Sequence, residues 1–344
     1  MSPAASRSPV AIAGELPPLP ERPVVSVIVP ARDAAAGLEG AVTTALSQEP
    51  TPDEVVIAVG PSRDDTRGRA QALAAAHPDR VLVVDNPSGA TADGLNAAIA
   101  RARGQVLARV DAHAVLPPGY LATAVATLRR TGAGNVGGVQ HPVGNTPMGR
   151  AVAAAMRSPA GTGGARYRSG GAEGPVDTVY LGVFRREALA AVGGFDPAFV
   201  RNQDAELNLR LTAAGYPVWF DPRLQVTYRP RQDLGSLARQ YLGYGRWRRL
   251  TVRTHPGSLR ARQLAAPLVV LALAGAGLAS ILSRDARPGT LVAGGYLGAV
   301  GLAGAHAAER PREAPATALA LLTMHVSWGV GFLLGPPRHV RSAL

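Results

Sequence analysis

The hydrophobic positions of the chain follow two different patterns. In the first third, short apolar runs that contain several valines lie at residues 24–30, 54–59, 81–85 and 105–111. Longer stretches with helical spacing follow the first three of these runs. This alternation of strands and helices predicts an α/β domain with a mostly parallel sheet and helices on both faces.

Polar residues follow each of the four predicted strands, at residues 30–33, 60–65, 85–86 and 111–113. Because ligands bind at the carboxyl ends of parallel strands, we expect these segments to line one rim of the sheet and to form a site. No GxGxxG follows the first strand, and GxxxxGK[ST] does not occur. Neither a dinucleotide fingerprint nor a P-loop is therefore predicted.

The last third of the chain is apolar. Residues 264–282, 288–308 and 314–335 contain no acidic or basic side chain apart from histidine. Each run is about 20 residues long, the length that crosses the hydrocarbon core as a helix. We therefore expect three transmembrane helices within residues 263–335. A buried helical hairpin of a soluble protein, or one re-entrant run, is the alternative.

The formal net charge of +12 is concentrated just before these runs. Residues 229–262 hold nine arginines and one acid, which gives +8 of the total. A basic segment beside an apolar span faces the cytoplasm by the positive-inside rule and contacts anionic lipid headgroups. We therefore expect a protein of the bacterial cytoplasmic membrane whose first 262 residues face the cytoplasm. Its partners would include membrane lipids but no nucleic acid.

The 344 residues contain no cysteine, which excludes a disulfide framework, a thiolate metal site and a cysteine nucleophile. The motifs HExxH and GxSxG and a histidine cluster with zinc spacing do not occur either. Any metal would therefore have to rest on oxygen and imidazole ligands.

Two segments on the predicted rim carry candidate chemistry. Asp111 and His113, at the end of the fourth strand, could both reach one Mg²⁺ or Mn²⁺ ion beside a diphosphate; a strand-end aspartate that caps a loop is the alternative. Asp204 lies where residues 201–211 begin a predicted helix. It could act as general base on a hydroxyl, whereas simple helix capping is the alternative.

A third segment, residues 239–250, interleaves arginines with aromatic residues beside the first apolar run. It predicts an interfacial amphipathic helix with tryptophan and tyrosine at the headgroup level. Its guanidinium and indole groups could also contact a diphosphate and its lipid. A fourth segment, residues 181–199, predicts a short strand, a helix and a tight turn at Gly193 and Gly194.

Taken in this order, these segments resemble the family 2 glycosyltransferases, which are inverting enzymes with a GT-A fold. The resemblance covers about residues 24–250. It is strongest to the exopolysaccharide-assembly subgroup that includes succinoglycan glucosyltransferases. It is carried by VSVIVPARD at the first strand, RVDAHA at the metal motif, LGVFRREALAAVGGFD, NQDAELNLRL at the Glu-Asp motif, and QYLGYGRW at the Gln-x-x-Arg-Trp motif.

The resemblance implies a Rossmann-like GT-A fold and a role for each segment. It implies Asp204 as the catalytic base, and Mg²⁺ or Mn²⁺ held by Asp111 and His113. Binding of the nucleotide-sugar donor is implied for Pro30, Ala31, Asp33, Asp85, Asn86, Asn96, Arg109 and Asp111. Contact with the acceptor or its diphosphate is implied for Arg201, Asn202, Gln240, Tyr244, Arg246 and Trp247.

Two positions depart from the family pattern. The second strand ends in Val59, Gly60 and Pro61, where the family carries acids that hold the nucleotide base; the nearest acids here are Asp64 and Asp65. In the Gln-x-x-Arg-Trp motif, residue 243 is glycine, and the glutamine stands one turn earlier. This second departure argues against a processive synthase.

The sequence therefore predicts a disordered leader (1–23), a GT-A domain (24–228), a basic juxtamembrane segment (229–262), three transmembrane helices (263–335) and a tail (336–344). The predicted activity moves a sugar from a nucleotide-sugar to a lipid-linked saccharide acceptor, carried on a polyprenyl diphosphate, in the assembly of a cell-surface polysaccharide. The alternative is a catalytically silent scaffold subunit of a polysaccharide complex, and the missing second-strand acid favours it.

Overall fold

The structure is a computed structural model that describes residues 16–336, and these fold into two compact units. The first unit comprises the described residues up to Val139 together with Ala172–Val226. The second comprises Gln140–Gly171 together with the described residues from Thr227 onward. Residues 1–15 of the predicted leader and 337–344 of the predicted tail lie outside the described residues. Residues 16–24 form neither helix nor strand, yet Leu19 packs in the core.

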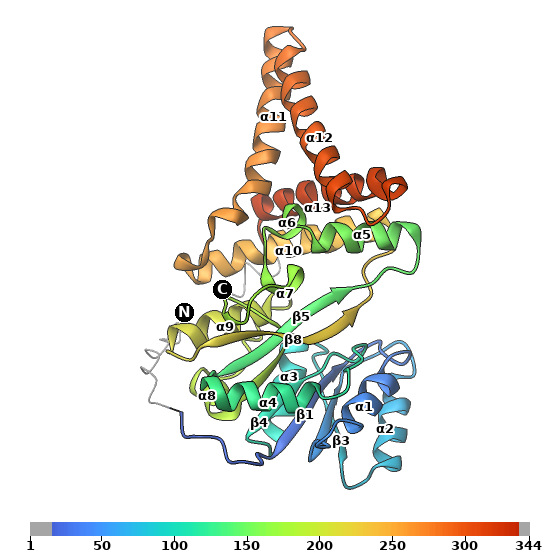
Figure 1. Cartoon of the computed structure of the whole chain (residues 1–344), viewed down its shortest axis with the longest axis vertical. Helices are drawn as coiled ribbons and strands as arrows, with labels where there is room; N and C mark the ends of the chain where they lie inside the picture. Colours follow the sequence, from blue (N-terminus) through green and yellow to red (C-terminus); the bar gives the residue numbers. More distant parts are fainter. Residues whose placement is uncertain (1–15, 337–344) are drawn as a thin grey trace, which may run out of the picture. The chain divides into compact units, whose positions relative to one another are not determined.

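An eight-stranded sheet organises the first unit (Figure 1). Its order is β3-β2-β1-β4-β7-β5-β8-β6. Strands β1 to β4 pair in parallel, as the apolar runs predict, and β7 pairs antiparallel with both β4 and β5. The prediction of a mostly parallel sheet is thus confirmed. The strands are β1 (Val25–Ala31), β2 (Glu54–Val59), β3 (Val81–Asp85), β4 (Val106–Arg109), β5 (Asn135–Pro142), β6 (Gly174–Pro175), β7 (Tyr180–Arg185) and β8 (Val218–Tyr228).

Helices cover both faces of this sheet, as predicted. Successive residues of a strand point to opposite faces, so Val27 and Val29 of β1 enter one core while Ile28 enters the other. Helices α1, α2 and α4 contribute Leu38, Ala70 and Leu128 to the first core, and helices α3 and α9 contribute Leu95 and Leu207 to the second. The helices are α1 (Leu38–Leu46), α2 (Thr66–Ala76), α3 (Thr91–Arg101), α4 (Tyr120–Thr131), α8 (Arg186–Ala191) and α9 (Gln203–Ala213).

The strand order reverses between β1 and β4, because β1 is followed in sequence by β2 on one side and pairs with β4 on the other. Such a switch point is where open α/β sheets bind ligands. The loops after β1 and β4 approach closely there, since a Cβ placed on Gly37 would lie 2.8 Å from the Ala112 carbonyl oxygen. The fold thereby brings residues 31–37 and 110–113 together.

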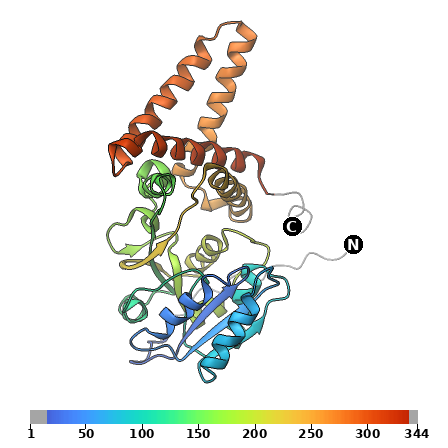
Figure 2. The same cartoon turned by 90° about the vertical axis from the view of Figure 1, so that its right-hand side faces the viewer.

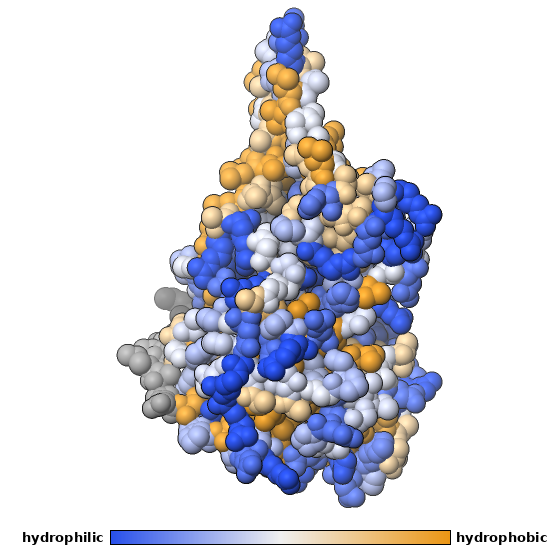
Figure 3. Space-filling view, viewed as in Figure 1, coloured by the Kyte–Doolittle hydropathy of each residue, from blue (hydrophilic) through white to orange (hydrophobic). Residues whose placement is uncertain are grey.

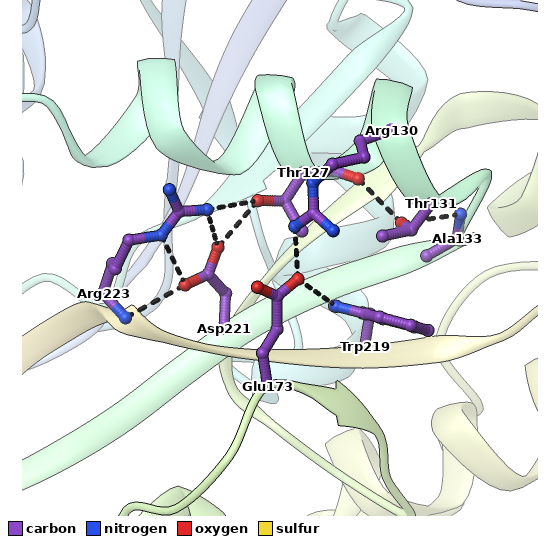
Figure 4. Close-up of polar contacts among 8 residues, drawn as sticks. All are labelled: Thr127, Arg130, Thr131, Ala133, Glu173, Trp219, Asp221 and Arg223. Atoms are coloured by element: carbon purple, nitrogen blue, oxygen red, sulfur yellow. Dashed lines mark hydrogen bonds and ion pairs between the residues drawn. The ribbon is translucent and has the colours of Figure 1, made fainter.

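A buried aspartate ties helix α4 to strand β8 in the first unit (Figure 4). Asp221, whose side chain is fully buried, accepts a hydrogen bond from Thr127 Oγ1 at 2.7 Å and another from Arg223 Nη2 at 2.7 Å. Burial raises the pKa of Asp221, but the hydrogen bonds from Arg223 and Thr127 outweigh that effect and hold its pKa below the ordinary value. Beside it, Glu173 accepts from Trp219 Nε1 at 2.7 Å.

The second unit is helical. Its helices are α5 (Pro147–Arg157), α6 (Pro159–Thr162), α7 (Arg166–Ser169), α10 (Leu234–Thr254), α11 (Ala265–Ser283), α12 (Arg287–Ala307) and α13 (Ala314–Leu334). Three short 3₁₀ turns connect them, η1 (Pro256–Ser258), η2 (Ala261–Gln263) and η3 (Pro311–Glu313). Helices α11 and α12 form a hairpin, and α13 crosses its base beside α10 (Figures 1 and 2). No sequence pattern had associated residues 140–171 with these C-terminal helices.

Three segments of the second unit are long and apolar enough to cross a membrane, namely Ala261–Ser283, Arg287–Ala307 and Pro311–Leu334. The hairpin of α11 and α12 exposes large apolar side chains along its length, among them Leu271, Ile281, Leu291 and Leu302. Figure 3 shows this apolar surface, with polar residues at the tip of the hairpin. The expectation of C-terminal helices of transmembrane length is therefore confirmed.

The Asp221 network leads to a prediction for stability. Asp221→Ala leaves the buried Thr127 hydroxyl without its acceptor and removes charge-assisted hydrogen bonds, so it should lower the free energy of unfolding by roughly 2–4 kcal/mol at pH 7. Urea unfolding of the full chain in detergent, followed by tryptophan fluorescence, measures this. Because the pKa of Asp221 is lowered in the fold, the stabilisation is present above its unfolded pKa and is lost as the pH falls through the folded one.

The matched control is Asp65→Ala, which removes a carboxylate that is 74% exposed and should change stability by less than about 0.5 kcal/mol. Equal stabilities of Asp221→Ala and the control at pH 7 would contradict the prediction.

Candidate active site

Two of the predicted site residues, Asp111 and Asp204, pair with a third, the buried Arg109. Arg109 ends strand β4 and is only 7% exposed. Its Nε donates a hydrogen bond to Asp111 Oδ1 at 3.0 Å, and Nη2 lies 2.9 Å from the same oxygen. Its Nη1 pairs with Asp204 Oδ1. A buried guanidinium needs counter-charges, and here the two carboxylates singled out as metal ligand and as base supply them.

The start of helix α9 positions Asp204. Asn202 adopts a left-handed conformation (φ 65°) immediately before the helix, and Asp204 lies in its first turn, where the helix dipole favours a carboxylate. Leu207 and Leu211 are fully buried one and two turns later and fix the helix on the core. The Asp204 side chain remains 46% exposed, so a substrate can reach it. The predicted helix with acids in its first turn is confirmed.

The environment of Asp204 changes its basicity. Desolvation raises the pKa of Asp204, the Arg109 guanidinium lowers it, and the Asp111 carboxylate raises it again, with a net increase over the ordinary value. Burial by itself would lower the pKa of Arg109, but Asp111 and Asp204 outweigh it and keep the guanidinium charged. Asp204 is therefore a stronger proton acceptor than a free carboxylate while it remains held in place by an ion pair.

Asp111 and His113 suit a divalent cation as a pair of ligands. Asp111 uses Oδ1 for Arg109, its side chain is 20% exposed, and His113 is exposed in the loop after β4. Within residues 16–336, histidine and acidic side chains nowhere gather in a group of three or more that could hold a metal. Mg²⁺ and Mn²⁺ accept one or two protein ligands when phosphate oxygens and water complete the shell. The donor set therefore fits a metal that binds together with a diphosphate.

The residues predicted around the first strand exit have mixed surroundings. Pro30 and Ala31 end β1, and Asp33 follows in a left-handed conformation (φ 48°) that exposes its side chain. Asp33 Oδ1 accepts from the Arg63 amide at 2.7 Å, so it fixes the neighbouring loop. Asp64, one of the two acids nearest the position of the missing one, accepts from the Ala35 amide at 2.9 Å. Both acids therefore brace the loops of the rim.

Backbone packing fills the position where the family carries its second-strand acid. A Cβ on Gly60 would lie 3.0 Å from Gly89 Cα, so these two loops touch. Arg32, which the sequence analysis did not single out, donates from Nη1 to the Gly89 carbonyl at 3.3 Å. Asn86 is buried and donates to the Ala90 carbonyl at 3.0 Å, whereas Asp85 is exposed beside Arg67. An arginine thus stands on this part of the rim.

Asn96 has a bracing role in this fold. Its Nδ2 donates to the Phe195 carbonyl at 2.7 Å, and its Oδ1 accepts from the Phe195 amide at 2.9 Å. Phe195 follows the predicted turn, in which Gly193 and Gly194 both have positive φ. The bidentate contact locks this turn onto helix α3, so both ends of the Asn96 amide are engaged by the protein itself.

The second unit holds the four predicted acceptor residues of α10. At about 100° per residue, Gln240, Tyr244 and Trp247 share one face of the helix, whereas Arg246 lies about 120° around from Gln240. Gln240 Nε2 donates to the Tyr244 hydroxyl at 3.0 Å, and Trp247 is only 5% exposed. The helix therefore brings three of the four together and turns the arginine elsewhere. In the first unit, Arg201 is exposed and Asn202 is half-buried.

This sheet, with a carboxylate pair at the switch point and a polar rim, is the architecture expected of a glycosyltransferase with a GT-A fold. The family model described as "Glycosyl transferase family 2" matches residues 26–193. The chain is also 35% identical over 311 residues to the succinoglycan biosynthesis protein ExoA of Rhizobium meliloti, covering 89% of this chain and 93% of that protein. The chain belongs to glycosyltransferase family 2.

A solved structure has the same fold. It is the mannosyltransferase PcManGT from Pyrobaculum calidifontis in complex with GDP-Man and Mn²⁺. The superposition has a TM-score of 0.60 at 22% identity and covers 92% of this chain and 90% of that one. The predicted family and fold are thus confirmed by sequence and by structure.

Proposed function

We propose that this protein is an inverting, metal-dependent glycosyltransferase that moves a sugar from a nucleotide-sugar to a lipid-linked saccharide in the assembly of an exopolysaccharide. The observation that carries the proposal is the arrangement of Asp111 and Asp204 around buried Arg109 at the strand switch point. The similarity to a succinoglycan biosynthesis protein supports the polysaccharide role. Apolar helices in the same chain favour an acceptor carried on a polyprenyl diphosphate.

In the proposed reaction, Asp204 accepts the proton of an acceptor hydroxyl as the hydroxyl oxygen bonds to the anomeric carbon of the donor sugar. The bond from that carbon to the diphosphate oxygen breaks on the opposite face, and its electron pair leaves with the diphosphate. Arg109 stays charged and orients Asp204 throughout. Attack opposite the leaving group inverts the anomeric centre.

The diphosphate would be held next to Asp111 and His113. These two side chains would bind Mg²⁺ or Mn²⁺, which supplies positive charge for the departing diphosphate. The rim residues Pro30, Ala31, Asp33, Asp85 and Asn86 are proposed to contact the nucleotide. Arg201 and Asn202, together with Gln240, Tyr244, Arg246 and Trp247, are proposed to contact the acceptor or its diphosphate.

The base assignment predicts the behaviour of Asp204→Asn. The amide cannot accept the hydroxyl proton, so the transfer rate should fall by about 10²–10⁴-fold. Donor affinity should stay within about twofold, because the base does not hold the nucleotide. Transfer of radiolabelled sugar to a lipid extract and calorimetric titration of the donor, both with Mn²⁺, give the two numbers.

Asp79→Asn is the control, since this exposed acid precedes β3, at the end of the strand opposite the rim, and should leave both numbers unchanged. Turnover of Asp204→Asn above about a tenth of the wild-type rate would refute the base assignment. Donor binding with no turnover by the wild-type protein would favour the catalytically silent scaffold instead.

We propose that helices α11 and α12 anchor the protein in the bacterial cytoplasmic membrane, with the first unit in the cytoplasm. The exposed leucines and isoleucine of the hairpin support this placement. The arginine-rich α10 just before the hairpin favours the cytoplasmic side.

The contacts of α13 argue that it lies on the membrane surface and does not form a third span. Its start is tied to α5, since Glu313 Oε1 accepts from Arg150 Nε at 2.8 Å. Halfway along, His325 Nε2 lies 2.8 Å from the Ala160 carbonyl oxygen, and Gly331 packs on the backbone of α10. Helix α10 carries five arginines, and each would cost about 2.5–3.5 kcal/mol at the bilayer centre. These contacts support a position of helix α13 at the depth of α10, in the interface.

This topology predicts which side of the membrane each end of the hairpin reaches. The chain has no cysteine, so single cysteines can be labelled with a membrane-impermeant maleimide without background. Asp285→Cys, between α11 and α12, should be labelled from outside intact cells. A cysteine appended after Leu344 should be labelled only after permeabilisation, as should the control His77→Cys at the exposed residue that follows α2. External labelling of the appended cysteine would mean that α13 crosses the membrane.

A further inference from the structure

The second unit contains a buried arginine to which no role has been assigned. Arg168, on the short helix α7, is only 6% exposed. Its guanidinium carbon lies 5.3 Å from the ring centroid of Tyr167 and 5.8 Å from that of Tyr228. Its Nη1 lies 3.9 Å from the sulfur of Met156. Within residues 16–336, no carboxylate pairs with Arg168, in contrast to buried Arg109.

These surroundings compensate the charge of Arg168 only in part. A guanidinium has five N–H donors and a full positive charge, and burying it without an anion is costly. Tyrosine faces attract the cation, and the Tyr167 hydroxyl is a neutral acceptor for it, but a thioether is a weak acceptor and none of these groups is an anion. The cluster therefore lacks an anion for Arg168, and a bound anionic ligand would supply it.

The neighbouring side chains of the same unit also have unused polar groups. Gln240 Nε2 donates to the hydroxyls of Tyr228 and Tyr244, at 3.0 Å each. Gln240 is 7% exposed, and its buried Oε1 has no hydrogen-bond partner among residues 16–336. Exchanging the amide nitrogen and oxygen leaves the other end unpaired instead, so one polar atom stays unsatisfied in either orientation. When Gln240 Nε2 donates to it, the Tyr228 hydroxyl keeps its own hydrogen available to donate.

We propose that Arg168, Tyr228 and Gln240 form a binding site for a diphosphate group. The planar fork of a guanidinium matches phosphate oxygens, and the Tyr228 hydroxyl adds a second donor. The choice of a diphosphate rests on the proposed function, because both substrates of that reaction, the nucleotide-sugar and the lipid-linked acceptor, carry this group.

The proposed site also explains which cation lies on the Gln240 face of α10. The sequence motif placed Arg246 with Gln240 and Tyr244, but the helix turns Arg246 about 120° away from Gln240. Arg168 contacts the ring of Tyr228, whose hydroxyl accepts a hydrogen bond from Gln240. In sequence, Arg168 precedes Gln240 by about 70 residues. Arg168 therefore supplies the cation on the face of α10 that carries Gln240 and Tyr244.

The test uses the full chain in lipid nanodiscs with three probes: UDP, GDP and farnesyl diphosphate. Arg168→Gln should weaken binding of at least one probe by about tenfold or more, as loss of a charge-assisted contact does. The matched control Arg166→Gln removes an exposed arginine from the same helix and should leave all affinities unchanged. Loss for farnesyl diphosphate alone assigns the site to the lipid, and loss for UDP or GDP alone assigns it to the donor.

Equal affinities of the wild-type protein and Arg168→Gln for every probe would overturn the proposal, as would failure of the wild-type protein to bind any of them. If Arg168→Gln abolishes the melting transition, Arg168→Lys and Tyr228→Phe replace it. The first keeps the charge without the fork, and the second keeps the ring without the hydroxyl. Both should bind several-fold more weakly, and unchanged affinity in both would also refute the site.

This outcome can be separated from that of the proposed function. Diphosphate binding that depends on Arg168, in a wild-type protein that transfers no sugar, would keep the site and remove the enzymatic role. Sugar transfer with no dependence on Arg168 would do the reverse.

Discussion

The candidate active site of the first unit depends on the burial of one positive charge, that of Arg109. A guanidinium at the end of a central strand is tolerated only with counter-charges, and two carboxylates supply them. Asp111 is local, two residues later in the chain, in the loop after β4. Asp204 arrives from 95 residues later in the chain, on the first turn of α9. The ion pair thus joins the parallel half of the sheet to helix α9, and it leaves the proposed base Asp204 next to Asp111.

A second buried arginine shows what happens when the counter-charge is absent. Arg168 is as buried as Arg109, but tyrosine rings and a thioether surround it in place of carboxylates. The physical rule is the same in both units. Where the protein supplies the anions, the arginine holds a carboxylate, the proposed base Asp204, in position. Where the protein withholds them, an anionic ligand can complete the cluster.

Sequence patterns foresaw the parts of the fold that carry strong local signals. Strands β1 to β4 are short apolar runs separated by helical stretches, so their existence and direction followed from composition and spacing. Strand β5 contains Gly137 and Gly138 and strand β8 contains Pro222, residues that weaken a strand pattern, and neither strand was predicted. The helical period alone could have separated Arg246 from Gln240 on α10.

The sequence predicted which residues form the candidate site but not how they contact one another. Asp111 and Asp204 were identified by resemblance and by position, whereas their common link to Arg109 spans a distance in sequence that no local pattern encodes. Arg32 and Gly89 at the rim, and Arg168 beside α10, were missed for the same reason. Each acquires its surroundings only when segments far apart in the chain pack together.

The central claim is that Asp204, held by Arg109, directs an acceptor hydroxyl onto the face of the sugar opposite the leaving diphosphate. The stereochemistry of the first product formed by the wild-type protein tests this most directly. Proton NMR of the anomeric signal, recorded during transfer from a donor of known configuration, should show the inverted anomer. A product that retains the configuration of the donor would contradict the account, because a single in-line displacement cannot produce it.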